Sequence, residues 1–150
     1  MNTENLRITK LRDYLFSVID EIVSNKKYQI NVDMLSDKID NYSLDKIPVA
    51  SEVEAWITGV EIHRDIYVFR SRRAYSQDVI NNLKNVGFFE IFESIIKSNN
   101  GNNILPKIDG IESIKCLNCG TMNNANTNTC EFQIQIEIKY ITGGEICVSL

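Results

Sequence analysis

The sequence EFQIQIEIKYI at residues 131–141 decides the fold, because apolar and polar residues alternate through it almost without error. Successive side chains of a β-strand point to opposite faces of a sheet, so one face of this segment is apolar and the other is polar. A helix would spread the same residues around its whole circumference. The segment therefore predicts a strand with one face on a core and the other open to water or to a partner.

The length and composition of the chain are those of one globular domain. The chain has 150 residues, of which 43% are hydrophobic and 24% are charged. These fractions are ordinary for a globular protein and provide for one core, so we predict a single domain over residues 1–150. The net charge is −4 at pH 7. An acidic domain lacks the basic surface that neutralises phosphates, so we expect no specific binding of nucleic acid.

The first residues and the length of the apolar runs indicate where in the cell the protein is located. The first residues, MNTENLR, lack the basic start and the apolar run of a secretion signal. No stretch approaches the roughly 18 consecutive apolar residues of a membrane span. We therefore expect an intracellular protein with no membrane partner, in which the four cysteines are reduced thiols.

Two segments have apolar residues at the spacing of a helix. Residues 5–24 predict an amphipathic helix that packs on a sheet, with a partner-binding helix as the alternative. Residues 76–98 predict one long helix that begins at Ser76, with a bend or a break at Gly87 as the alternative. Gly101 follows this helix in the place of a left-handed cap.

Shorter apolar runs predict the remaining strands. They are residues 28–32, residues 42–47 at an edge of the sheet, a hairpin over residues 49–70 that turns near Gly59, and residues 111–117. The second arm of the hairpin ends apolar on both faces, which predicts a central strand covered on both sides. Residues 121–129 are polar and predict a loop. The sum is an α+β fold, a largely antiparallel or mixed sheet with the N-terminal helix and the long central helix packed on one face.

Positive charge is concentrated at residues 70–73, which read Arg-Ser-Arg-Arg in an otherwise acidic chain. A solvated turn is the favoured interpretation of this cluster. A contact with an acidic neighbouring subunit is the alternative. A nucleic-acid patch ranks third, because no surface of interleaved aromatic and basic residues follows.

The strongest candidate for a metal site is Cys116-Leu-Asn-Cys119-Gly, because many zinc knuckles begin with such a turn. Cys130 and Cys147 would complete four ligands, although they lack paired spacing. A small zinc-binding interaction module is therefore an alternative, and unremarkable thiols are favoured over it. A redox dithiol lacks the strand–Cys-x-x-Cys–helix setting.

The sequence carries no catalytic signature of comparable clarity. His63 is the only histidine, and the chain has no glycine-rich phosphate loop, no serine elbow and no metal-binding histidine pair. Carboxylate pairs such as Glu52 and Glu54 occur on most solvated surfaces, and no apolar pocket is implied that would raise a pKa for acid–base chemistry. We expect a protein that is not an enzyme and that holds no cofactor or metal.

Several segments resemble a group of small phage proteins in their order and spacing. They are IPVA at 47–50, YVFRSR at 67–72, DVINNL at 78–83, GFFE at 87–90, MNNANTNT at 122–129 and FQIQ at 132–135. The group is labelled minor capsid or minor tail protein in prophages of low-GC Gram-positive bacteria. Its members resemble tail terminators, also called tail completion proteins, of long-tailed phages and of phage-tail-like bacteriocins. The resemblance covers residues 42–140, and the group lacks the Cys-x-x-Cys.

The resemblance implies an α+β subunit that forms a hexameric ring on the tail tube. Such a ring stops tube polymerisation and provides the head-proximal, or collar, interface. Its partners would be copies of itself, the tail tube protein, the head connector where a head is present and the sheath protein where the tail contracts. It would assemble in the host cytoplasm and stay at the head-proximal end of the particle, with DNA free to pass through. A head–tail adaptor or another tail-assembly protein is the alternative.

A closed ring needs heterologous contacts between identical copies, and a regular polar sheet face with an Asn-rich loop suits such contacts. We predict that the contacts involve the basic cluster, the hairpin turn and the polar loop. The residues are Arg70, Arg72, Arg73, Gly59, Asn123, Asn124, Asn126 and Asn128.

Overall fold

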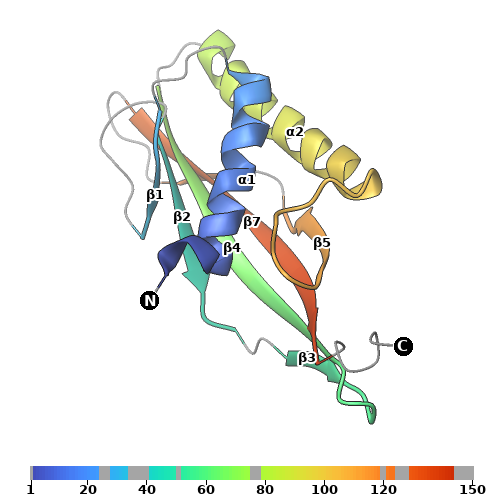
Figure 1. Ribbon diagram of the computed structural model, residues 1–150. Helices are drawn as coiled ribbons and strands as arrows, with labels where there is room; N and C mark the ends of the chain where they lie inside the picture. Colours follow the sequence, from blue (N-terminus) through green and yellow to red (C-terminus); the bar gives the residue numbers. More distant parts are fainter. Residues whose placement is uncertain are drawn as a thin grey trace.

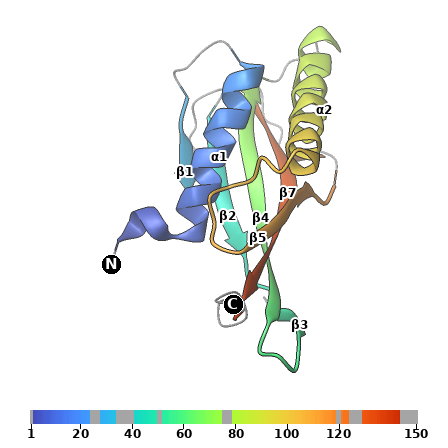
Figure 2. The ribbon, with the colours of Figure 1, turned by 45° about the vertical axis from the view of Figure 1, so that its right-hand side comes forward.

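The computed structural model describes residues 2–23, 28–33, 41–49, 52–74, 79–118, 121–123 and 129–143 (Figure 1). Within these ranges, seven strands form one mixed sheet, and two α-helices lie on the same face of it (Figures 1 and 2). The predicted α+β fold is therefore confirmed. The elements in chain order are η1 (Thr3–Asn5), α1 (Arg7–Ile22), β1 (Ile30–Val32), β2 (Tyr42–Ile47), β3 (Glu52–Ala55), β4 (Glu61–Ala74), α2 (Val79–Gly101), β5 (Ile111–Cys116), β6 (Thr121–Asn123) and β7 (Thr129–Thr142).

Two long antiparallel strands form the centre of the sheet. β4 and β7 have 14 residues each and pair along their whole length. β2 and β3 pair with successive parts of the other edge of β4, while β5 and β6 do the same on β7. Among the described strands, β1 and β2 form the only parallel pair. The alternating segment 131–141 is thus confirmed as a strand, and it lies in the middle of the sheet.

The core lies between the sheet and the two helices. Every second residue of β7 is buried on the helix side, as the alternation predicted. Burying one such side chain contributes roughly 1.5–3 kcal/mol. The main contributors are Phe132, Ile134, Ile136 and Ile138 from β7, Leu11, Leu15, Val18 and Ile19 from α1, and Phe88, Phe92 and Ile96 from α2.

Stacked aromatic rings connect the sheet to α2. The rings of Phe69 on β4 and Phe92 on α2 are nearly parallel, with centroids 5.1 Å apart and an interplanar angle of 2°. Tyr42 on β2 stacks on the other side of this pair, 5.3 Å from Phe69. Aromatic pairs of this kind add about 0.5–1.5 kcal/mol beyond their burial, so they determine where α2 lies on the sheet.

The structure corrects two predictions about the sheet. The segment 42–47 is not an edge strand, because β1 pairs with it on the side away from β4. The second half of β4 is not covered on both sides by the described elements, because both helices lie on the face of Tyr67 and Phe69. On the opposite face Ile66 is buried and Val68 is half-buried, although no described helix lies there.

The structure also corrects two local predictions. The predicted long helix is confirmed, and α2 continues unbroken through Gly87, but the left-handed residue that follows it is Asn103, with φ 59°, instead of Gly101. Asparagine adopts this conformation more readily than most residues. The predicted loop 121–129 begins with a strand, because β6 pairs with residues 131–133 of β7. The predicted N-cap Ser76 lies outside the described residues.

One part of the sheet extends beyond the helices. The hairpin of β3 and β4, together with the end of β7, projects away from the helix layer (Figure 1). We call residues 52–64 and 139–143 the arm, and residues 54–61 the arm tip. The predicted hairpin is confirmed.

Candidate assembly surfaces

The arm tip carries two exposed apolar side chains. Ile57 is fully exposed, and Trp56 is 49% exposed. The turn is closed by backbone hydrogen bonds from Trp56 N to Val60 O, at 2.8 Å, and from Gly59 N to Trp56 O, at 2.9 Å. The indole Nε1 of Trp56 donates to Oε1 of Glu54 at 2.7 Å. The tip therefore presents apolar surface whose one polar donor is already satisfied.

Gly59, which the sequence singles out, lies in this turn with φ +87°. The end of β7 approaches it at Gly143, where φ is +78°. A Cβ atom at Gly143 would lie 2.2 Å from the carbonyl oxygen of Gly59, so only glycine permits this approach. The turn is thus held against β7 by backbone contacts.

The sheet face opposite the helices carries Arg70 in a network of acceptors. Its Nη2 lies 2.5 Å from Oδ2 of Asp45 and 3.2 Å from Oγ of Ser43, and its Nη1 lies 3.3 Å from Oε1 of Glu131. Arg70 and Asp45 are on adjacent strands, β4 and β2, and Glu131 is on β7. The charge of Arg70, which we predicted to face a partner, is therefore neutralised within its own subunit.

A second carboxylate on this face is paired in the same way. The side chain of Glu137 on β7 is only 5% exposed. It lies 3.6 Å from Arg64 on β4 and 3.6 Å from Lys115 on β5. A buried carboxylate without cations would be costly, so these two side chains offset its desolvation. On this face of the sheet, Arg70 and Glu137 are thus each matched by opposite charges on neighbouring strands.

The other predicted contact residues lie at different places. Arg72 and Arg73 belong to β4, opposite Glu131 and Cys130, so the predicted solvated turn is wrong. The ladder to β7 continues through them because their partners on β7 are still extended. Asn123 on β6 is also opposite Glu131, so the sheet places Arg72 and Asn123 on either side of one carboxylate residue. Asn124, Asn126 and Asn128 lie outside the described residues.

Sequence reasoning missed a cluster around Asp65, whose side chain is completely buried on the helix side of β4. Its Oδ2 accepts a hydrogen bond from Nε of Arg7 at 2.8 Å. Lys46 Nζ lies 3.5 Å from its Oδ1. The hydroxyls of Tyr67 and Tyr140 donate to the carboxylate at 3.4 and 3.5 Å. The one signal in the sequence is that Asp65 directly precedes the apolar run IYVF at residues 66–69.

The pKa values of Arg7, Tyr67 and Tyr140 are raised in the cluster, so these donors stay protonated. Burial, together with the negative charge of Asp65, raises the pKa of both Tyr67 and Tyr140. Burial lowers the pKa of the Arg7 guanidinium, but its hydrogen bond with Asp65 and that carboxylate's charge outweigh burial and raise the pKa overall. The Arg7 guanidinium also lies over the Tyr140 ring, 4.5 Å from its centroid. The cluster thus joins α1 to the sheet through donors that keep their protons at neutral pH.

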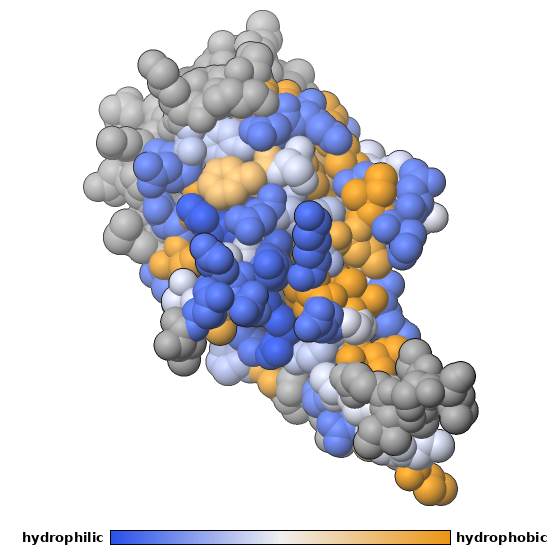
Figure 3. Space-filling view, in the orientation of Figure 1, coloured by the Kyte–Doolittle hydropathy of each residue, from blue (hydrophilic) through white to orange (hydrophobic). Residues whose placement is uncertain are grey.

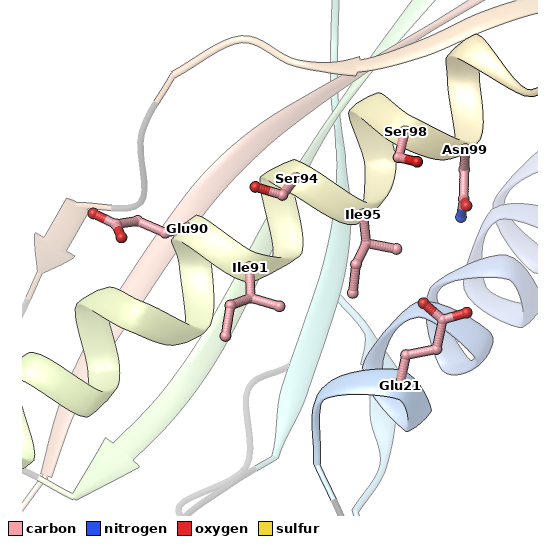
Figure 4. A pocket seen from close by; sticks show the side chains of 7 residues that line it. All are labelled: Glu21, Glu90, Ile91, Ser94, Ile95, Ser98 and Asn99. Carbon is pink, nitrogen blue, oxygen red and sulfur yellow. The ribbon is translucent and has the colours of Figure 1, made fainter.

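A hollow of about 400 Å³ lies between α1 and α2 (Figure 4). Ile91 and Ile95 of α2 point to the same side, and Glu21 of α1 lies across from them. The lining contains the carboxylates of Glu21 and Glu90 and no cation among the described residues. The hollow is therefore acidic at its rim.

Two adjoining hollows lie nearer the N-terminus of α1, between α1 and the segment that follows α2, and they are basic. They have volumes of about 520 and 470 Å³, and both are lined by Lys10 and Lys107. The first also contains Arg7 and Tyr140, and the second contains Ile104 and Leu105, with Ile104 54% exposed. We call the two together the basic groove. Asp13 and Asp109 are the acidic residues of its lining.

The strand register excludes the alternative of a zinc site with four cysteine ligands. Cys116 lies in β5 opposite Ile136 of β7, and Cys130 lies six residues earlier in β7. Six residues of a strand span roughly 20 Å. Two thiolates so far apart cannot share an ion whose bonds to sulfur are about 2.3 Å long. Cys119 and Cys147 lie outside the described residues.

The Cys116 thiol itself is held in its neutral form. Its side chain packs against the core, half-buried between β5 and the helices. Burial, followed by the negative charge of Glu93, raises the pKa of this thiol to about 12. A thiolate is the form that attacks disulfides and binds metals, so Cys116 is chemically quiet near neutral pH.

No protein-family model and no curated protein matches this chain. Neither helix in the described part of the chain combines the length and the apolar character that a membrane span requires. Within the same residues, no three side chains of His, Cys, Asp or Glu are grouped so that they could hold a metal ion.

Proposed function

We propose that this chain is a structural assembly protein, the tail terminator of a long-tailed phage or of a phage-tail-like bacteriocin. Copies form a hexameric ring on the head-proximal end of the tail tube, where they stop polymerisation and provide the collar interface. The chain acts by fitting against other proteins and not by transforming a substrate.

The resemblance supports this role through segments of the folded framework. YVFRSR lies in β4, GFFE lies in α2, and FQIQ lies in β7. These are the central strands and the helix that packs on them. The resemblance therefore concerns the elements that build the fold, and the α+β architecture agrees with the subunit that it implies.

The observation that carries the proposal is the arm. Ile57 is fully exposed and Trp56, its neighbour in the sequence, is half exposed. Both belong to the turn of a hairpin that projects from the subunit. Exposed apolar side chains on a projecting element are typical of contacts with another protein. Covering the fully exposed Ile57 would contribute roughly 1.5–3 kcal/mol, and covering the exposed half of Trp56 would add to this. In an assembly a neighbouring protein can bury the apolar tip of the arm, whereas in a monomer the tip stays exposed to water.

The polar face of the sheet is compatible with a covered position. Several of its charges are already matched within the subunit, as between Arg70 and Asp45 and between Arg64 and Glu137. A neighbouring protein can cover matched charges without burying an unpaired one, which would cost several kcal/mol. The face can therefore lie against another ring component.

The test is electron microscopy of particles from a producing strain that lacks this chain. We expect tubes of normal width and excessive, variable length, and we expect the wild-type chain supplied in trans to restore the length. A gold or antibody label on the chain should lie at the head-proximal end of the tube. Tubes of normal length without the chain would overturn the proposal. A label on the head side of the connector would favour a head–tail adaptor.

A further inference from the structure

We propose that the arm tip of one copy docks into the basic groove of the next copy. The inference rests on the proposed function for its setting, the ring. It names the two surfaces of the chain that meet there.

The tip and the groove are complementary in charge. Two carboxylates, Glu54 and Glu61, flank the exposed apolar side chains of the tip. Two ammonium groups, Lys10 and Lys107, lie on the lining of both hollows of the groove. Acidic groups on one surface and basic groups on the other attract the surfaces and fix their relative orientation.

The tip and the groove are also complementary in their apolar parts. Ile104 of the groove is 54% exposed and lies with Leu105 and Pro106 beside Lys107. Figure 3 shows hydrophobic surface next to the hydrophilic patch over the N-terminal half of α1, and more at the far end of the arm. The Trp56 indole already donates to Glu54, so covering it leaves no unpaired N–H group. A hollow of about 470 Å³ is large enough for an indole or a branched aliphatic side chain.

The contact joins two copies. Trp56 and Ile57 line neither hollow of their own groove, and the tip borders that groove at its base, where Glu61 pairs with Thr142 of the first hollow. The tip lies beyond the helix layer, at the end of the sheet that carries β3 (Figure 1). Each copy then offers one tip and receives one tip. Such a heterologous contact closes into a ring when the rotation between copies permits it.

A charge exchange in the purified full-length chain tests the contact. Glu54→Lys and Lys107→Glu each place like charges in the contact, so we expect each to weaken self-association about tenfold or more in sedimentation velocity across a concentration series. An equimolar mixture of the two variants should associate again within about threefold of wild type. In that mixture every tip can find a groove of opposite charge.

The matched controls are Lys97→Glu and Glu90→Lys, two exposed charges of α2 outside both surfaces. They should leave self-association unchanged. Ile57→Ser removes only the apolar contact, and because Ile57 is fully exposed its variant should unfold like wild type while associating at least about fivefold more weakly.

Two results would overturn this contact. One is a wild-type chain that stays monomeric up to about 1 mM. The other is a mixture that associates no better than the single variants. If the chain stays monomeric but its absence still lengthens the tubes, the contact fails and the proposed function stands. Normal tubes with a restored mixture would show the reverse.

Discussion

The Nε atom of Arg7 donates a hydrogen bond of 2.8 Å to Oδ2 of Asp65, which joins the first turn of α1 to the middle of β4. The Arg7 side chain is 43% exposed, whereas that of Asp65 is fully buried. Water can replace Asp65 as a partner of Arg7, but it cannot reach the carboxylate in the same way. Losing this contact therefore costs more free energy at the buried Asp65 carboxylate than at the partly exposed Arg7 guanidinium.

Removing Arg7 should destabilise the protein more than removal of an ordinary surface arginine. We expect Arg7→Ala to lower the free energy of unfolding by about 2 kcal/mol, because the buried carboxylate loses its shortest contact. In the Asp65→Asn background the same change should cost less than about 0.5 kcal/mol, a typical surface value. Urea denaturation followed by circular dichroism measures the four variants of this cycle.

Lys97→Ala is the control for Arg7→Ala, because Lys97 is an exposed helical cation. It should change the free energy of unfolding by no more than about 0.5 kcal/mol. Equal costs of Arg7→Ala with and without the Asp65 carboxylate would mean that the two residues are not coupled.

Replacing two of the glycines by alanine should change the stability of the protein in opposite directions. Gly110 has φ +74°, and a Cβ there would lie 2.2 Å from the carbonyl oxygen of Ile141. We expect Gly110→Ala to destabilise the protein by about 2 kcal/mol, because the left-handed backbone and the close oxygen both oppose a side chain. Gly87 lies inside α2 with nothing within 4 Å of its Cβ position, so Gly87→Ala should stabilise by roughly 0.5–1 kcal/mol. Thermal unfolding of both variants shows whether each is more or less stable than wild type. A stabilising Gly110→Ala would contradict the described turn.

The stacked pair of Phe69 and Phe92 should show a measurable coupling. Each single change to alanine should lower the free energy of unfolding by about 3–5 kcal/mol, because both rings are fully buried. The double variant should cost less than the sum by about 0.5–1.5 kcal/mol, the value of an aromatic pair. Ile91→Ala, one residue from Phe92 but half exposed, is the control and should change stability little. Additive costs would show that the two rings do not support each other.

Cys116 should react slowly with alkylating reagents while the protein is folded. With a pKa of about 12 its thiolate fraction at pH 8 is roughly one in ten thousand. Below that pKa the fraction rises tenfold with each pH unit, so the alkylation rate should rise in proportion. Mass spectrometry of the Cys116 peptide after iodoacetamide treatment, in the native and in the urea-unfolded chain, gives both rates. Equal rates in the two states would mean that the thiol is not buried as described.

The strands and helices with the clearest periodicity were predictable from residues alone. β7 and α1 follow repeats of two and of three to four residues, which depend only on local backbone geometry. Features that depend on distant pairing were predicted less well. The segment 42–47 was expected at an edge, but β1, 12 residues earlier in the chain, pairs with it in parallel. Residues 70–73 were expected in a turn, but β7 keeps them extended.

Of the candidate surfaces, too, only those that depend on local sequence were predictable. The hairpin turn at Gly59 was predictable, because a glycine between two alternating runs marks a turn. The basic groove was not, since its lysines come from α1 and from the segment after α2, which are 97 residues apart in the sequence. The pairing of Arg70 was equally hidden, because its acceptors lie on two other strands.

The sequence by itself determined which residues of β7 face the core and which face outward, because side-chain direction in a strand repeats every two residues. Only the tertiary structure decided that Asp65 is buried beside Arg7, that Arg70 pairs with carboxylates of its own subunit, and that Ile57 is exposed at the end of the arm. Each of these depends on strand neighbours and register, and such long-range choices are made by packing and not by local pattern.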